Sequence, residues 1–148
     1  NARCATAWRR GWPITSTVGS SSGVVRGSSV MTSGWFDAVT LPDGRHFVPR
    51  QGNNSYIFPG LGLALVVVGA TRVTDAMFLT AARTLARCTS QADLDQGSLF
   101  PPLSAVREVS ARIAVDVAEI ALRDGLASIE RPADMAEAIR AEMYDPRY

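Results

Sequence analysis

The most apolar part of the chain, residues 57–70, limits the possible folds more than any other feature. It is shorter than the roughly 20 apolar residues of a membrane-spanning helix, and Gly60, Gly62 and Gly69 interrupt it. A helix that is apolar on all sides is buried by its neighbours. The sequence therefore predicts a buried helix that begins near residue 54 and ends near residue 70, inside a fold that supplies further helices to cover it.

The clearest helical periodicity follows the Pro101-Pro102 pair. Apolar side chains recur at spacings of three and four, at Leu103, Val106, Val109, Ile113, Val117 and Ile120. Gly125 is placed to end this helix. Shorter helices are predicted after Thr74, whose hydroxyl can cap the first turn, and between Ser90 and Gly97. A last helix is predicted around Pro132, a residue that a first helical turn accepts.

A β-hairpin is predicted before the helices. Ala38–Leu41 and Arg45–Val48 read as two short strands, and the Asp43-Gly44 pair between them favours a tight turn. Residues 1–34 differ from the rest, because they are rich in Ser and Gly and lack helical or strand periodicity. We interpret them as a flexible segment or as sequence outside the fold.

Composition excludes several classes of protein. A chain of 148 residues is one domain or a piece of a larger one. The net charge is +1 and Lys and Arg form no run, which argues against nucleic acid as the main partner. No membrane partner is expected. Cys4 and Cys88 form no metal or redox motif. With few thiols and no recognisable signal peptide, we expect a cytoplasmic location.

The segment 51–60 is the best candidate for a binding site. Two adjacent carboxamides, Asn53 and Asn54, lie between a strand end and a buried helix, where open α/β sheets bind ligands. A carboxamide donates and accepts hydrogen bonds without charge, which suits a hydroxy acid. The alternative is a turn with a helix cap, and spacing alone does not separate the two. Tyr56 and Phe58 are expected in the core.

The other polar candidates favour structural roles. His46, the only histidine, lies in the hairpin without an evident carboxylate or cysteine partner and is expected at the surface or across the strands. Asp93 and Asp95 suit a helix start and its solvated face. Glu108 and Asp116 are expected in surface ion pairs with nearby arginines. The sequence has no P-loop, no Gly-x-Gly-x-x-Gly after a strand and no clustered metal ligands.

Residues 51–60, Gln-Gly-Asn-Asn-Ser-Tyr-Ile-Phe-Pro-Gly, are very similar to a signature near the end of the malic enzymes. Further segments resemble that family in order, at residues 39–44, 47–49, 73–79, 99–103, 107–114, 125–127 and 143–148. Residues 35–148 are therefore identified as resembling the C-terminal part of the malic enzyme NAD-binding domain with its helical tail. Residues 1–34 depart from the family pattern, and we interpret them as an altered reading of the expected segment or as a linker.

The resemblance implies a fold and a reaction. The fold is α/β: the C-terminal portion of a Rossmann-like NAD(P)-binding domain, with a hairpin followed by mostly α-helices. The reaction is the oxidative decarboxylation of (S)-malate to pyruvate and CO2, with reduction of NAD or NADP. A divalent Mg or Mn ion acts as a Lewis acid in this family. The asparagine pair borders the substrate cleft, so Asn53 first and Asn54 second are assigned to malate binding.

The resemblance also limits what the chain can do. The family's lysine base, tyrosine acid, metal ligands and glycine-rich cofactor turn match no position here, so no catalytic, metal or cofactor residue is assigned. The full-length enzyme is expected to be a homo-oligomer. The chain alone is expected to be inactive and to self-associate through uncovered apolar residues such as Val66, Val67 and Val68. A non-catalytic helical binding module derived from the family and a malolactic enzyme fragment remain as alternatives.

Overall fold

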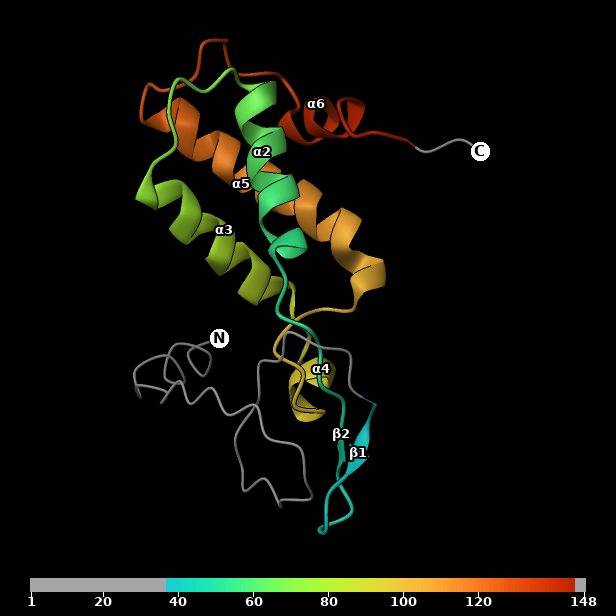
Figure 1. The fold of residues 1–148 in the computed structure, drawn as a ribbon. Helices are drawn as coiled ribbons and strands as arrows, with labels where there is room; N and C mark the ends of the chain where they lie inside the picture. The colour runs from blue at the N-terminus through green and yellow to red at the C-terminus, as the bar shows by residue number, and fades with distance from the viewer. Residues whose placement is uncertain (1–36, 146–148) are drawn as a thin grey trace.

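The computed structural model describes residues 37–145, and the predicted boundary at residue 34 lies outside them (Figure 1). Strands β1 (Val39–Thr40) and β2 (His46–Phe47) pair in antiparallel register. Gly44 closes the turn with a φ of 83°, and its N–H donates to the Leu41 carbonyl at 2.9 Å. The hairpin is confirmed, but each strand is shorter than predicted.

Helical elements make up most of the rest. In chain order they are η1 (Asn54–Tyr56), α2 (Phe58–Val67), α3 (Asp75–Cys88), α4 (Gln91–Asp95), η2 (Leu103–Ala105), α5 (Val106–Arg123) and α6 (Met135–Ala141). The long helix α5 packs against α2, α3 and α6, whereas α4 lies with the hairpin at the other end of the molecule (Figure 1). None of the described helices has the length and apolar character that a membrane span requires.

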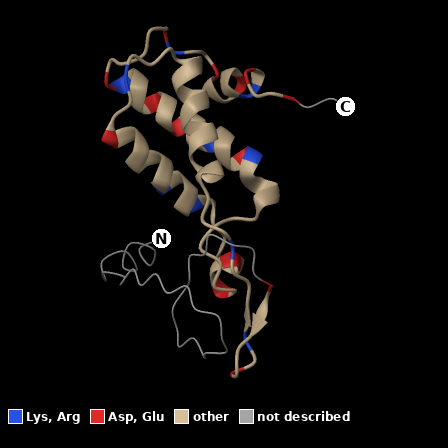
Figure 2. Ribbon diagram, in the orientation of Figure 1, with Lys and Arg blue, Asp and Glu red and all other residues tan. Residues whose placement is uncertain are grey.

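Helix α5 follows its predicted periodicity. Val109, Ile113 and Val117 are buried, and Figure 2 shows acidic and basic positions between them along the same helix. Leu103 belongs to η2 and is exposed rather than buried, because the chain enters α5 only at Val106. The sequence pattern therefore identified the buried face of α5 but placed its start one turn too early.

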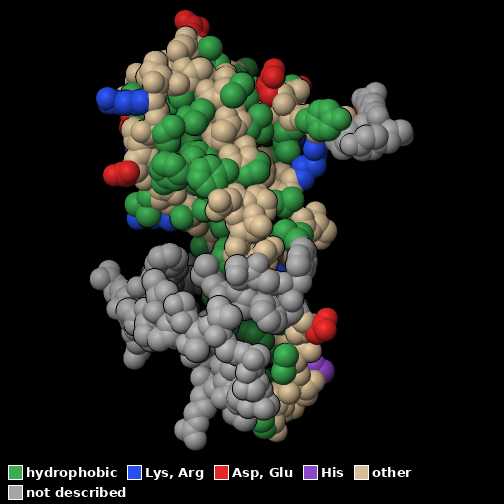
Figure 3. Space-filling model, in the orientation of Figure 1, with side chains coloured by type: hydrophobic (Ala, Val, Ile, Leu, Met, Phe, Trp, Pro, Cys, Tyr) green, Lys and Arg blue, Asp and Glu red, His purple; other side chains and the backbone are tan. Residues whose placement is uncertain are grey.

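Helix α2 is not buried on all sides, and the prediction that it would be is wrong. It packs on α5 through Gly60, Leu61 and Ala64, whereas Phe58 and Val66 are 54% and 74% exposed. Figure 3 shows hydrophobic side chains gathered on the face that α2 and α3 form. An all-apolar sequence cannot reveal which face meets a neighbour, so the packing partners decided it.

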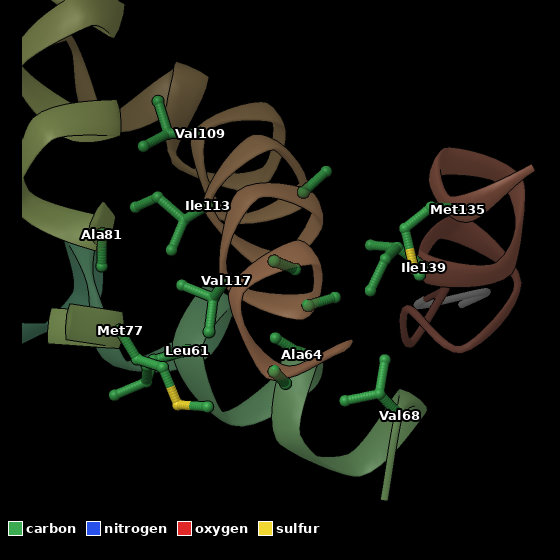
Figure 4. Close-up of a cluster of buried hydrophobic side chains, with 14 of the residues drawn as sticks. Leu61, Ala64, Val68, Met77, Ala81, Val109, Ile113, Val117, Met135 and Ile139 are labelled. Atoms are coloured by element: carbon green, nitrogen blue, oxygen red, sulfur yellow. The ribbon is translucent and has the colours of Figure 1, made fainter. Parts of the chain in front are cut away.

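The core surrounds α5. Figure 4 shows Ile113 and Val117 facing Met77 and Ala81 of α3, and Ile139 of α6 lies on another side of α5. All five side chains are fully buried. The described helices therefore share one core, and α5 occupies its middle.

Two predicted helix ends differ from the structure. Thr74 is the N-cap residue of α3, but its hydroxyl makes no capping hydrogen bond, and this buried oxygen has no partner among the described residues. Pro132 lies before the N-cap of α6 rather than in its first turn. Asp134 caps that helix by accepting the Glu137 N–H at 2.9 Å. Both helices thus have a residue suited to capping at the N-cap position, Thr74 or Asp134, but only the Asp134 side chain makes the capping hydrogen bond.

Candidate functional site

The asparagine pair lies in the exposed segment between the hairpin and α2. Asn53 has an extended backbone, with φ −138° and ψ 147°, and is the N-cap of η1. Its side-chain Oδ1 accepts the Ser55 N–H at 2.9 Å, and its Nδ2 lies 3.5 Å from the Gln51 Oε1. The capping interpretation is thus correct for the oxygen end of Asn53. A cap occupies only that oxygen, so the amide end can still donate to a ligand.

An open depression adjoins the pair. It is lined by Asn54, Ser55, Phe58 and Pro59, and Asn53 precedes it directly in the chain. Phe58, expected in the core, instead exposes half of its side chain here and meets Phe78 edge to face, with ring centroids 6.4 Å apart. The structure therefore places the two carboxamides at a partly apolar surface that is open to solvent.

Arg50 holds the chain just before this segment. Its Nη1 donates to Asp93 Oδ1 at 2.6 Å and to the Phe100 carbonyl at 2.7 Å, and both charged side chains are largely buried. Asp93 also completes the capping box of α4 with Ser90, as its predicted role at a helix start requires. The sequence carries no signal for the Arg50–Asp93 pair, because the two residues lie 43 positions apart.

Tyr56 holds the chain just after the asparagines. It is 1% exposed, its hydroxyl donates to the Pro101 carbonyl at 2.6 Å, and its ring stacks on Phe100 with centroids 5.2 Å apart. Burial raises the pKa of Tyr56. The core location predicted for this residue is confirmed. Arg50 and Tyr56 therefore fix both ends of the exposed segment to residues 93–101.

The remaining polar candidates have structural surroundings. His46 is exposed, and its Nδ1 lies 3.3 Å from the Thr40 hydroxyl across the strands, as predicted. Glu108 pairs with Arg112 one turn away at 3.1 Å. Asp116 also forms an ion pair, but its partner is Arg87 of α3 rather than an arginine of its own helix. Tertiary packing places Arg87 of α3 beside Asp116, and the sequence does not indicate that these two residues are neighbours.

A metal ion does not fit the described residues. Within residues 37–145, no three His, Cys, Asp or Glu side chains lie together where they could hold a metal. We therefore derive no chemical step through a metal on this part of the chain.

Neutralising the Asp93 carboxylate should remove its ion pair with Arg50, which holds the chain before the asparagine pair. Hydrogen bonds from Ser90, and then from Arg50, lower the pKa of the Asp93 carboxyl below its usual value, although burial opposes them. A lowered folded-state pKa gives stability that is present above the unfolded value of about 4 and is lost as the pH falls through the folded value. At pH 7 we expect Asp93→Asn to lower the free energy of unfolding by about 2 kcal/mol.

Thermal unfolding followed by circular dichroism at pH 7 and pH 3 measures this difference. The difference in stability between the wild-type chain and Asp93→Asn should narrow at pH 3, because this pH lies below the unfolded pKa of about 4, where protonation of Asp93 favours the unfolded wild-type chain. Asp95→Asn is the matched control on the same helix, since Asp95 is exposed and only accepts a hydrogen bond from Gln91. If the difference in stability between the wild-type chain and Asp93→Asn were the same at both pH values, the Asp93 carboxylate would not stabilise the fold through its ion pair with Arg50.

Known proteins resemble the chain over most of its length. A family model described as "Malic enzyme, NAD binding domain" matches residues 19–122. The NADP-dependent malic enzyme of Rattus norvegicus is 40% identical over 127 residues, which are 84% of this chain and 22% of that protein. The mitochondrial NADP-dependent malic enzyme of Homo sapiens is 42% identical over 127 residues, with 84% and 21% covered.

A relative from Dictyostelium discoideum, also named NADP-dependent malic enzyme, is 48% identical over 105 residues, which are 71% of this chain and 19% of that protein. The chain thus spans about a fifth of the length of these relatives. The hairpin followed by helices agrees with part of a Rossmann-like α/β domain. The chain belongs to the malic enzyme family, and it matches that family's NAD-binding domain.

Proposed function

We propose that this chain supplies the malate-binding asparagines of an enzyme that oxidises and decarboxylates malate to pyruvate. One observation carries the proposal: in a member of the malic enzyme family, Asn53 and Asn54 are exposed on a segment that is fixed at both ends, by Arg50 and by Tyr56. Fixing a segment before its ligand arrives reduces the ordering cost of binding. The same carboxamides on a free turn would lack that advantage.

Asn53 has the primary role in this proposal. Its oxygen accepts the Ser55 N–H, and its amide nitrogen lies 3.5 Å from the Gln51 Oε1. A carboxamide nitrogen carries two hydrogens, so Asn53 can also donate to a carboxylate or hydroxyl of malate. Asn54, which lines the adjoining depression, has the secondary role. NADP is the proposed hydride acceptor, because the relatives are named NADP-dependent, and NAD is the alternative. Mg or Mn is proposed as the metal, with ligands outside this chain.

A chimeric enzyme tests the assignment. The chain replaces the matching segment of the rat NADP-dependent malic enzyme, and malate-dependent NADPH formation is followed by absorbance. We expect the chimera to be active and the chain alone to be inactive. Asn53→Ala should lower kcat/KM by about 100-fold, through the loss of a hydrogen bond to a charged group, and Asn54→Ala should lower it less.

Asn53→Asp is the matched control, because it separates capping from substrate binding. Aspartate caps a helix as well as asparagine does, but it places a negative charge where malate would bind. We expect this variant to keep the wild-type melting temperature and to lose activity like Asn53→Ala. Full activity of Asn53→Asp would refute the substrate role and leave Asn53 as a cap alone.

Two alternatives make different predictions for the same assay. A helical binding module is favoured by the apolar side chains that α2 and α3 expose, and it predicts an inactive chimera with a folded chain. A malolactic activity would yield lactate from malate without net NADPH.

We propose a cytoplasmic location and a homo-oligomeric full-length enzyme. A fluorescent fusion tests the location, and its import into mitochondria, as the name of the human relative suggests, would contradict it.

A further inference from the structure

A second hollow lies between α3, α5 and α6, and no part of the asparagine segment lines it. Its volume is about 360 Å3. The lining combines charged and small apolar side chains: Thr84, Arg87, Cys88, Glu108, Ala111, Arg112, Val115, Asp116, Ala136 and Arg140. Three different helices therefore contribute to one concave surface.

Charged residues form a row along one side of this hollow. Glu108, Arg112 and Asp116 follow one another at intervals of four on α5, so they share a face and extend over about 12 Å of the helix axis. Arg140 of α6 approaches the Glu108 end at 3.8 Å, and Arg87 of α3 pairs with Asp116 at the opposite end. The arginines thus occupy both ends and the middle of the row.

The row has more positive than negative charge. Three guanidinium groups face two carboxylates. Asp116 is shared by Arg87 and the Thr84 hydroxyl, whereas Glu108 alone serves both Arg112, at 3.1 Å, and Arg140, at 3.8 Å. A guanidinium stays charged at any pH a protein tolerates and binds a carboxylate through two parallel N–H groups. The three arginines therefore share two carboxylates, and the charged side chains that line the hollow carry a net charge of +1.

Small apolar side chains lie between the charged ends. Ala111 is buried, and Val115 and Ala136 are half-buried along the lining. We propose that this hollow binds a small dicarboxylate, whose two carboxylates pair with the arginines while its carbon chain rests on Ala111, Val115 and Ala136. An inorganic phosphate would meet the same arginines but would have no carbon chain to bury there.

Titration of the 148-residue chain with succinate, followed by isothermal calorimetry, tests the proposal. We expect saturable binding that weakens as salt is added. Arg112→Gln and Arg140→Gln should each raise the Kd by about tenfold or more, because each removes a charge-assisted pair. Arg123→Gln should leave the Kd within about twofold. It is a matched control on α5, where Arg123 pairs with Asp124 outside the hollow.

Further titrations separate this site from the asparagine segment and from phosphate binding. Succinate binding should be unchanged in Asn53→Ala. Loss of binding in that variant would place the ligand at the asparagines and overturn the proposal, and so would an absence of binding to the wild-type chain. Phosphate that binds as tightly as succinate would overturn the dicarboxylate assignment.

Alkylation of Cys88 gives a second measurement of binding, independent of the heat that calorimetry records. It is half-buried and lines the hollow. In a Cys4→Ser background, succinate should slow alkylation of Cys88 at least threefold, and Arg112→Gln should abolish this protection. An alkylation rate that succinate leaves unchanged would contradict binding in the hollow.

Discussion

Tyr56→Ala is expected to lower the free energy of unfolding by about 4 kcal/mol, the range found when a large buried aromatic side chain is removed. Tyr56 is almost fully buried and stacks on Phe100, so the substitution leaves a cavity beside that ring. It also leaves the Pro101 carbonyl without the hydroxyl that donates to it. Because single domains are stable by only about 5–15 kcal/mol, this is a large fraction of the total.

Tyr56→Phe is the control that isolates the hydroxyl. It keeps the stacked ring and removes only the hydrogen bond to Pro101, so we expect a loss of about 1–2 kcal/mol. Urea unfolding, followed by the far-ultraviolet circular dichroism of the helices, measures the stability of both variants. Hydrogen exchange of the residue 51–57 amides should also accelerate in Tyr56→Ala, because this side chain fixes one end of the asparagine segment. Equal stabilities for the two variants would show that the ring contributes nothing.

Gly60→Ala is expected to lower the free energy of unfolding by about 2 kcal/mol, although alanine is the better helix former. A Cβ atom at Gly60 would lie 2.6 Å from the Ser110 carbonyl oxygen and 2.8 Å from the Ile113 Cβ. Both belong to α5, so α2 and α5 would have to move apart along the interface that supports the core. Backbone and β-carbon atoms cannot turn away as the end of a flexible side chain can.

Gly62→Ala, on the same helix, is the matched control. A Cβ at Gly62 meets nothing within 4 Å, so we expect this substitution to stabilise the chain by up to about 1 kcal/mol through helix propensity alone. Chemical denaturation of the two variants in parallel gives the comparison. If both substitutions were stabilising, the close approach of α2 to α5 would not exist in solution.

Much of the candidate site could be predicted from sequence, because its residues are neighbours in the chain. Asn53 and Asn54 stand out as adjacent carboxamides after a strand, and the surrounding signature identifies the family. The contacts that hold the asparagine segment in place could not be predicted from the sequence. Arg50 meets Asp93, and Tyr56 meets Pro101, across more than 40 positions. Neither contact leaves a pattern in one sequence.

The sequence by itself determined several features of the local structure of this protein. The Asp43-Gly44 turn, the Ser90 capping box and the buried stripe of α5 each depend on residues within a few positions of one another, and each is present. Backbone conformation and side-chain periodicity act over that range, so one sequence is enough to predict them.

Only the tertiary structure decided which surfaces meet. Helix α2 is apolar throughout, and its packing on α5 through Gly60 selected one buried face and left Val66 exposed. In the same way, the approach of α3 gave Asp116 its partner Arg87 in place of an arginine on its own helix. The energies of such contacts depend on distances between elements far apart in the chain, and those distances exist only once the helices have packed together.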